Sequence, residues 1–561
     1  MLTERISEAL REATAALGAG SARFRLDRPR DTSHGDLATN AAMAVAGRLG
    51  RPSREIARDL KERLDGIDGV ERIEIAGPGF LNFFLESAAM GGTVQAILGL
   101  GRRYGRNEDG GGRRVMVEFV SANPTGPLHL GHGRQAALGD AIASLLEWSG
   151  WTVHREFYFN DAGGQIHRLA VSVRARYRQR LGHDAPVPED GYQGEYVSEI
   201  AAGLIERDGP KYEDDRSEAA LEAMRCFAVS LLRREQERDL AAFNVRFDEY
   251  YPETRLYSDG LVANTISKLH ETGLTYREDG ALWLRTSSFG DQKDRVMVKR
   301  DGSPTYFLPD VAYHMNKWER GFQDVINVQG SDHHSTVDRV RAGLQALDRP
   351  SDYPEYVLHQ MVTVERDGEE VRFSKRAGSY TTLADLVAEV GADVARYFFL
   401  MRRPEGHLTF DLDLALDQSD RNPVYKVQYA HARLCRLFKL AGERGWAADH
   451  ETLMSADTSL LVDRSEREVV KQLAEFPALL RRAATGRAPH LVCDYLEKTA
   501  GMVNSWYQTG HPTRNPKLSA LVDDPGLRGA RLALAGAARA VLNNGLTVLG
   551  LDAPERMVRD D

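Results

Sequence analysis

Two histidines, His129 and His132, lie three residues apart, and a glycine stands on either side of His132. They follow the β-branched and apolar run 115–120 and precede a helical apolar pattern that begins at Ala136. The amino terminus of a helix presents unpaired N–H groups and partial positive charge, so phosphate binds well there. Imidazoles at such a position can donate hydrogen bonds to phosphate oxygens in a transition state. We expect a phosphate site; a two-histidine metal site and a purely structural loop are the alternatives.

Two later segments have residues suited to the same chemistry. Arg372, Ser374 and Lys375 form a cationic segment next to a glycine, which could hold the β- and γ-phosphates of a nucleotide. The segment 329–334 (QGSDHH) follows the strand-like run 325–328, and ligands in open α/β sheets bind at the carboxyl ends of strands. A solvated basic turn and a structural strand-end turn are the respective alternatives.

The elements that position these residues resemble a nucleotide-binding α/β unit. Strand-like 115–120, a loop, a helix and strand-like 151–161 predict a parallel crossover. We therefore expect an α/β fold with a Rossmann-type parallel sheet over residues 106–420. Within it we expect a helical insertion at about 166–250, and strand-like segments follow at 281–284, 295–299 and 325–328.

The two ends of the chain have different patterns. Residues 1–105 combine a helical start with a strand–turn–strand segment at 73–85, which predicts a small α+β domain. Residues 421–561 have a helical pattern throughout and predict an all-α domain.

Composition limits the classes of protein that fit. The 561 residues are 42% hydrophobic and 28% charged, which excludes a largely disordered chain, and no apolar run is long enough for a membrane span. Three widely spaced cysteines exclude a disulfide framework and a CxxC zinc site, and fit a reducing cytosol. The net charge of −9 argues against a nucleic-acid partner, yet residues 421–561 hold 20 Lys/Arg against 16 Asp/Glu. That basic third fits either a polyanion-binding surface or compositional noise.

In this order, the histidine pair, the aspartate-bearing turn and the cationic loop resemble the class I aminoacyl-tRNA synthetases. The resemblance is to the arginyl-tRNA synthetase family in particular and extends over essentially the whole chain. It rests on the segments 117–140, 158–166, 306–310, 422–433 and 553–557.

The resemblance implies roles for individual residues. The family's HIGH region matches Ala122, Asn123, Pro124, Thr125, Gly126, Pro127, Leu128, His129, Leu130, Gly131 and His132. ATP binding is implied for Pro127, His129, Gly131, His132, Asp332, His333, Arg372, Ser374 and Lys375. Catalytic roles are implied for His129, His132 and Lys375. Arginine's α-amino and carboxyl groups are assigned to Ser121, Asn123, His132 and Tyr306, with Gln329 or Ser331 near the α-amino group. Its guanidinium is assigned to Glu118 and Asp310, because a planar fork of donors pairs with carboxylates.

One departure concerns the family's KMSK loop, which reads Arg372-Phe373-Ser374-Lys375 here. Some family members lack the second lysine and carry one at the position of Gly126 instead. Because this chain has Gly126 and Lys375, the catalytic cation is assigned to Lys375, and the contribution of Arg372 stays open.

The implied activity is ATP-dependent formation of arginyl adenylate and transfer of arginine to tRNA(Arg), with Mg²⁺ but no structural zinc. Like its relatives, the enzyme is expected to need tRNA before it activates arginine, and to be a cytoplasmic monomer that binds neither membrane nor DNA. The C-terminal domain is expected to bind the anticodon, and the N-terminal domain with residues 34–40 (HGDLATN) resembles the family module that contacts the tRNA elbow. Candidate stacking residues are Tyr425, Tyr429, Trp506 and Tyr507, each of which could instead belong to the core.

Three alternative functions remain open from the sequence alone. The first is a class I synthetase for another amino acid, against which Glu118 and Asp310 argue. The second is a non-catalytic tRNA-binding relative, and the third is a nucleotidyltransferase that acts on a small molecule.

Overall fold

A five-stranded parallel sheet forms the centre of the molecule. The computed structural model describes residues 2–29, 34–370, 382–511 and 514–557. The strands of the sheet lie in the order β12-β11-β5-β6-β7. Their bounds are β5 (Arg114–Glu118), β6 (Thr152–Phe159), β7 (Glu249–Pro252), β11 (Asp324–Gly330) and β12 (Glu355–His359). All four neighbouring pairs are parallel, which confirms the fold class expected from the sequence.

The direction of winding reverses beside β5. From β5 the chain passes through α5 (Leu130–Trp148) to β6 on one side, whereas β11 later lies against the other side of β5. In the register of the sheet, Glu118 is the partner of Glu156 on β6 and of Asn327 on β11. Ligands of such sheets bind at the carboxyl ends of the strands where the winding reverses. The fold therefore points to the end of β5 as the site.

Helix α5 packs closely against the residues that follow β5. Most of its side chains are buried, including Leu138, Ile142 and Leu145. Gly139 faces the ring of Phe119, and a Cβ atom at this position would overlap that ring. The glycine thus lets the loop after β5 lie directly on the helix that the loop leads into.

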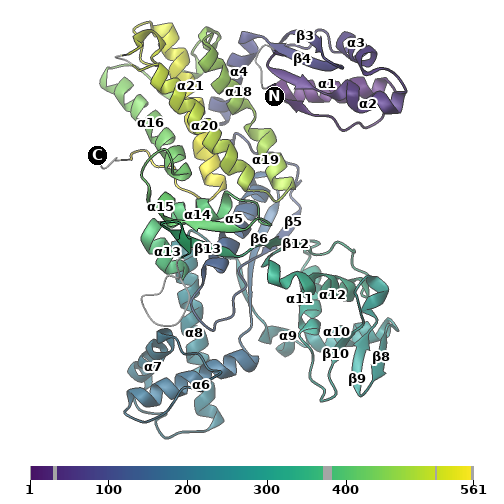
Figure 1. The fold of residues 1–561 in the computed structure, drawn as a ribbon, viewed down its shortest axis with the longest axis vertical. Helices are drawn as coiled ribbons and strands as arrows, with labels where there is room; N and C mark the ends of the chain where they lie inside the picture. Colours follow the sequence, from purple (N-terminus) through teal and green to yellow (C-terminus); the bar gives the residue numbers. More distant parts are fainter. Residues whose placement is uncertain (1, 30–33, 371–381, 512–513, 558–561) are drawn as a thin grey trace.

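Two lobes extend from the sheet, away from the C-terminal helices (Figure 1). Three helices between β6 and β7 form one lobe, where a helical insertion was expected: α6 (Gly163–Arg180), α7 (Glu195–Asp208) and α8 (Glu218–Ala242). The other lobe contains α9 (Thr254–Ser258), α10 (Leu261–Glu271), α11 (Phe307–Glu319) and α12 (His334–Gln345). It also contains a separate antiparallel sheet of β8 (Thr275–Glu278), β9 (Ala281–Leu284) and β10 (Arg295–Val298). Two of the three later strand-like segments therefore lie outside the central sheet.

The chain between β12 and the C-terminal helices packs against α5. Its strands are β13 (Val362–Arg366), β14 (Glu369–Glu370) and β15 (Leu408–Asp411), and its helices are α13 (Leu383–Val390), α14 (Ala392–Leu400) and α15 (Leu412–Leu416). Arg396 of α14 is 1% exposed and pairs with Asp140 of α5. Its Nε also donates to the carbonyl of Leu549 at 2.5 Å, so one side chain ties α5 to the C-terminal part of the chain.

The N-terminal part is a small α+β unit. Its strands β1 (Leu26–Asp27), β2 (Leu37–Thr39), β4 (Phe80–Leu85) and β3 (Val70–Ala76) form an antiparallel sheet in that order. The pairing of β3 with β4 confirms the predicted hairpin. Helices α1 (Leu2–Ala16), α2 (Ala41–Leu49) and α3 (Ser53–Arg63) complete the unit.

The C-terminal part is all helical, as predicted. It contains α16 (Pro423–Glu443), α17 (His450–Met454), α18 (Arg464–Ala474), α19 (Phe476–Thr485), α20 (His490–Thr509) and α21 (Pro525–Val548). Helix α4 (Ser87–Leu100) precedes the central sheet in the sequence but packs against α21 (Figure 1). Beyond α4, the side-chain amide of Asn544 donates to the carbonyls of Gly101 and Tyr104, at 2.9 and 3.0 Å. Within the described part of the chain, no helix is both long and apolar enough to cross a membrane.

Candidate active site

A cavity of about 960 Å³ lies over the carboxyl ends of the central strands. It brings together most of the residues expected from the sequence: Glu118, Ser121, Asn123, His129, Gly131, His132, Tyr306, Asp310, Gln329, Asp332 and His333. Pro127 is not part of the cavity lining, and Ser331, the alternative to Gln329, is not either. Arg372, Ser374 and Lys375 lie outside the described residues.

The two histidines cap the amino terminus of α5 with their own rings. Nδ1 of His129 accepts the backbone N–H groups of Gly131 and His132, at 3.1 and 3.4 Å, and Nδ1 of His132 accepts the N–H of His129 at 3.3 Å. Both Nδ1 atoms are therefore unprotonated acceptors, which leaves Nε2–H as the donor of each neutral ring. The rings stack at 3.6 Å between centroids. Capping thus fixes the tautomer that can donate to phosphate.

Desolvation keeps both rings neutral. It lowers the pKa of His129, and it lowers the pKa of His132 to about 3, with further contributions from His129 and His359. Near pH 7 each imidazole is therefore a neutral hydrogen-bond donor, and the positive potential at this point comes from the amino terminus of α5.

The loop before α5 is held by the helical insertion. The hydroxyl of Tyr196 on α7 donates to the carbonyl of Thr125 at 2.7 Å. The side-chain amide of Gln236 on α8 donates to the carbonyls of Asn123 and Gly126, at 3.2 and 3.1 Å. The insertion therefore positions the segment that was predicted to contact ATP.

Backbone strain marks the end of β5. Val120 and Ser121 have φ values of 67° and 43°, which lie in the left-handed region that L residues other than Gly, Asn and Asp rarely adopt. This turn aims the Ser121 hydroxyl at Oε1 of Glu118, to which it donates at 2.8 Å. Asn123 is oriented by the backbone N–H of Asn160, which its side-chain oxygen accepts at 3.0 Å.

Four carboxylates line the cavity, and they differ in their partners. Asp332 is largely exposed and lies 3.6 Å from Nε2 of His333, whereas the other three are more buried. Glu118 is 5% exposed and pairs with the buried Lys317, whose Nζ lies 2.5 Å from Oε2. Glu253 accepts a hydrogen bond from the hydroxyl of Tyr158 at 2.8 Å. Among the described residues, no side chain forms an ion pair or hydrogen bond with the carboxylate of Asp310. The carboxylates without a cation partner are thus those of Asp310 and Glu253.

The pKa values of both of these carboxyl groups are raised. Burial, and then the negative charge of Glu253, raise the pKa of Asp310 to about 7. Burial also raises the pKa of Glu253, and the charge of Asp161 adds to the effect. A carboxylate held near half-protonation at neutral pH is poised to bind a cation, because the cation restores its ionised form.

Glu253, Tyr158, Arg339 and Lys317 were not assigned to the site from the sequence. Glu253 comes directly after β7, so the rule for strand ends would have singled it out. That strand was missed because residues up to about 250 were assigned to the helical insertion. The pairing of Lys317 with Glu118 joins residues 199 positions apart, and no local pattern indicates it.

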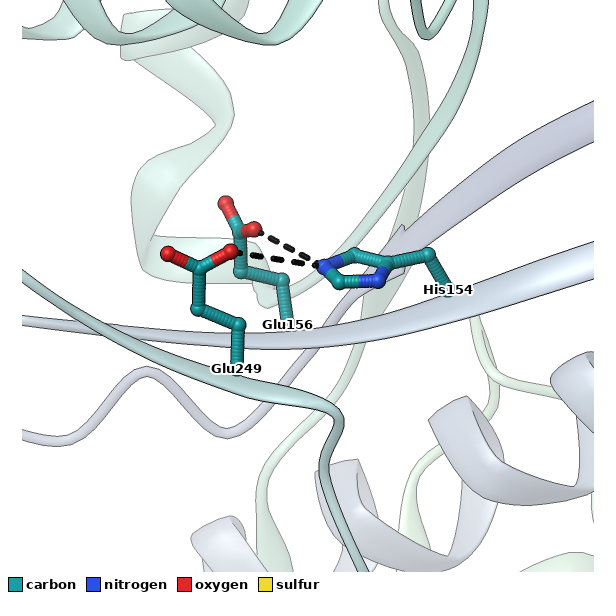
Figure 2. A group of neighbouring side chains, drawn as sticks. All are labelled: His154, Glu156 and Glu249. Atoms are coloured by element: carbon teal, nitrogen blue, oxygen red, sulfur yellow. Dashed lines mark hydrogen bonds and ion pairs between the residues drawn. The ribbon is translucent and has the colours of Figure 1, made fainter. Parts of the chain in front are cut away.

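A second cluster of potential metal ligands lies outside the cavity. Figure 2 shows Nε2 of His154 facing the carboxylates of Glu156 and Glu249, at 3.2 and 3.8 Å. The guanidinium of Arg320 lies against the same carboxylates, 2.5 Å from Glu156 and 2.7 Å from Glu249. Tyr313 also donates to Glu156 at 2.6 Å. The cluster is therefore an ion-pair network in which the guanidinium of Arg320 takes the place that a metal ion would need.

The four aromatic residues suggested for tRNA contact divide into two pairs. Tyr425 and Trp506 are buried, at 8% and 3% exposure. Tyr429 and Tyr507 are partly exposed. The guanidinium of Arg433 lies over both of their rings, at 4.6 and 5.0 Å, and donates to Asn504 at 2.7 Å.

Comparison with known proteins assigns three successive segments of the chain to protein families. Residues 1–85 match the arginyl-tRNA synthetase N-terminal domain, residues 93–398 match the catalytic domain of class I (R) tRNA synthetases, and residues 427–557 match the DALR anticodon-binding domain. The arginine–tRNA ligase of Geotalea daltonii is 50% identical over 540 residues, covering 95% of this chain and 94% of that one. The chain belongs to the arginyl-tRNA synthetase family.

Further relatives of this family agree with the assignment. The arginine–tRNA ligase of Cupriavidus metallidurans is 48% identical, covering 100% of this chain and 98% of that one. The crystal structure of Thermus thermophilus arginyl-tRNA synthetase has the same fold, with a TM-score of 0.78 at 24% identity, and covers 99% of this chain and all of that one. Arginyl-tRNA synthetases are class I synthetases, as expected from the order of the motifs.

The N-terminal HGDLATN segment has a structural role within the chain. Asp36 accepts the backbone N–H of Leu85 at 2.7 Å and pairs with Lys471 of α18 at 2.5 Å. Gly35 has φ +88°, and a Cβ there would lie 2.7 Å from the carbonyl oxygen of Phe83. The segment therefore holds β4 in place and docks the N-terminal unit on the C-terminal helices.

Proposed function

We propose that the chain activates L-arginine with ATP and transfers it to the terminal adenosine of tRNA(Arg). One observation carries the proposal: a single cavity joins a histidine-capped helix terminus, suited to phosphate, with two partly buried carboxylates that have no cationic side chain as a partner among the described residues. A substrate with a guanidinium at one end and a carboxylate that reacts with ATP at the other matches both halves. The family assignment supports the same activity.

Asp310 and Glu253 are proposed as the acids that bind the guanidinium. Charge-assisted pairing to a planar fork of donors distinguishes arginine from lysine. Glu118, which was also expected to bind the guanidinium, accepts one hydrogen bond on each oxygen, from Lys317 and Ser121, and each oxygen can accept a second. We therefore keep Glu118 as a further acid of the arginine pocket. Rejection of substrates that leave Asp310 and Glu253 unpaired gives specificity without an editing step.

The first step joins arginine to AMP. An oxygen of the arginine carboxylate attacks the α-phosphorus of ATP, a P–O bond forms, and the bond to the β-phosphate breaks, releasing pyrophosphate. ATP enters as its Mg²⁺ complex. The Nε2–H groups of His129 and His132 donate to phosphate oxygens, and Lys375 neutralises the departing pyrophosphate. In the second step a ribose hydroxyl of the terminal adenosine attacks the carbonyl carbon of arginyl adenylate, and AMP leaves.

We assign tRNA binding to both ends of the chain. Tyr429, Arg433 and Tyr507 present a partly exposed stack suited to single-stranded bases. Tyr425 and Trp506 would support it from the core. A monomer in the cytoplasm is proposed as well, and the three free thiols, Cys226, Cys435 and Cys493, fit a reducing compartment.

Charging of total tRNA with each of the twenty amino acids tests the proposal. Arginine alone should be esterified to tRNA, and ATP–pyrophosphate exchange with arginine should require tRNA. Charging with a different amino acid would favour another class I specificity, and tRNA binding without charging would favour a non-catalytic relative. Exchange at full rate without tRNA would contradict the expected tRNA dependence.

A further inference from the structure

Lys317 is a fully buried cation beside the proposed arginine pocket. It lies near the end of α11, its side chain is 0% exposed, and Nζ donates to Oε2 of Glu118 at 2.5 Å and to Oδ1 of Asn327 at 3.1 Å. Nζ also lies 4.3 Å from the centre of the Tyr313 ring. Burying an ammonium group is costly unless it is paired and hydrogen-bonded, so these contacts define one preferred position for it.

The position of Lys317 coincides with the reversal of the sheet. Glu118 on β5 and Asn327 on β11 are register partners on adjacent strands, and Lys317 contacts both side chains. A single ammonium therefore bridges the two strands at the point where the substrate site begins. The contact with Glu118 joins two opposite charges in a charge-assisted hydrogen bond.

The same contacts extend through Asn327 and His314 to the backbone of Asp310. The side-chain amide of Asn327 donates to Nε2 of His314 at 2.7 Å, and Nδ1–H of His314 donates to the carbonyl of Asp310 at 2.8 Å. Burial lowers the pKa of His314, which keeps this ring neutral and fixes its two roles. Asp310, His314 and Lys317 are spaced by four and three residues, so they share one face of α11.

We propose that Lys317 is a positioning residue for arginine recognition, which holds the carboxylate of Glu118 in one orientation toward the cavity. Its second contact, through Asn327 and His314, fixes the helix that carries Asp310. Ser121 restrains the other oxygen of Glu118, so the carboxylate has one orientation toward the substrate. The inference rests on the proposed function, because it assigns Lys317 to the substrate of that same cavity.

Lys317→Met tests the proposal by removing the charge while keeping most of the side-chain volume. In aminoacylation at saturating ATP and tRNA, the KM for arginine should rise about tenfold or more, because Glu118 loses its cation. The KM values for ATP and tRNA should stay within about twofold. If Lys317→Met does not fold, Lys317→Gln provides the same measurement.

Rescue by the conservative variant separates positioning from a merely structural role. Lys317→Arg retains the positive charge and should restore most of the arginine affinity.

Arg320→Met is the matched control. Arg320 follows α11 directly and pairs with Glu156 and Glu249, which do not line the cavity. This variant should lower Tm and leave the KM for arginine near that of the wild type. A folded Lys317→Met or Lys317→Gln with unchanged KM for arginine would overturn the proposal, as would Lys317→Arg behaving like Lys317→Met. A wild-type chain that does not charge arginine would instead refute the proposed function.

Discussion

The affinity for arginine should depend on pH through Asp310. Burial and the nearby charge of Glu253 raise the pKa of Asp310 to about 7. A guanidinium binds the ionised carboxylate, so arginine has to displace the proton wherever Asp310 is protonated. Because the pKa is raised in the free protein, affinity is full well above pH 7 and is lost as the pH falls below it.

The expected size follows from this pKa. If only the ionised form binds, the apparent Kd is multiplied by the inverse of the ionised fraction, about twofold at pH 7 and about elevenfold at pH 6. The Kd should therefore be about tenfold higher at pH 6 than at pH 8. Binding at pH 7 should release about half a proton. The pKa of Glu253 is also raised, so the measured midpoint belongs to the pair.

Calorimetric titration with arginine at pH 6, 7 and 8 measures the Kd directly. Repetition in buffers of different ionisation enthalpy gives the number of protons released. Asp310→Asn is the control, because it should flatten the profile and weaken binding at pH 8 by about 1.5–3 kcal/mol. Equal Kd values at pH 6 and pH 8, with no proton release, would show that Asp310 does not bind the guanidinium.

Three further predictions concern the histidine pair, the cationic loop and the packing of α5. Nitrogen-15 NMR of the imidazoles at pH 6.5 should show His132 neutral and protonated on Nε2, since desolvation lowers its pKa to about 3, and an imidazolium signal would contradict the capping geometry. Lys375→Ala should reduce turnover about tenfold or more with tRNA binding near that of the wild type, and an unchanged rate would assign the cation role elsewhere. Gly139→Ala should destabilise the protein by about 1–3 kcal/mol in thermal unfolding, because the added Cβ overlaps Phe119, whereas Gly47→Ala on α2, which faces open space, should not. Equal Tm values for both glycine variants would refute the packing argument.

The parts of the fold that could be predicted from the sequence are those with local patterns. The run 115–120 and the helical spacing after Ala136 indicate β5 and α5, and segments 73–76 and 80–85 indicate the pairing of β3 with β4. Which strands share a sheet is not local information. Segments 281–284 and 295–298 have ordinary strand patterns, yet they pair with each other in a separate antiparallel sheet.

The residues of the candidate site also include some that local patterns indicate and some that they do not. His129, His132 and Asp332 belong to segments whose neighbours indicate strand ends or helix starts, so their place in the cavity could be expected. The partners of Glu118 could not be expected from the sequence, because Lys317 comes into contact with Glu118 only when α11 packs onto the sheet. Tyr425 and Trp506 show a similar limit, since aromatic residues have the same sequence signature in a core and on a surface.

The packing of α4 against α21 makes the two ends of the chain interdependent. Val94 and Ile97 of α4 are fully buried in the same apolar core as Leu534 and Val541 of α21. A recombinant fragment that starts at residue 421 would expose that surface to water and would be prone to aggregate. A stable excised version of the helical end has to include residues 87–104, supplied in trans or joined by a linker. Insertions that lengthen the connection between α4 and β5 should be tolerated better than deletion of α4 itself.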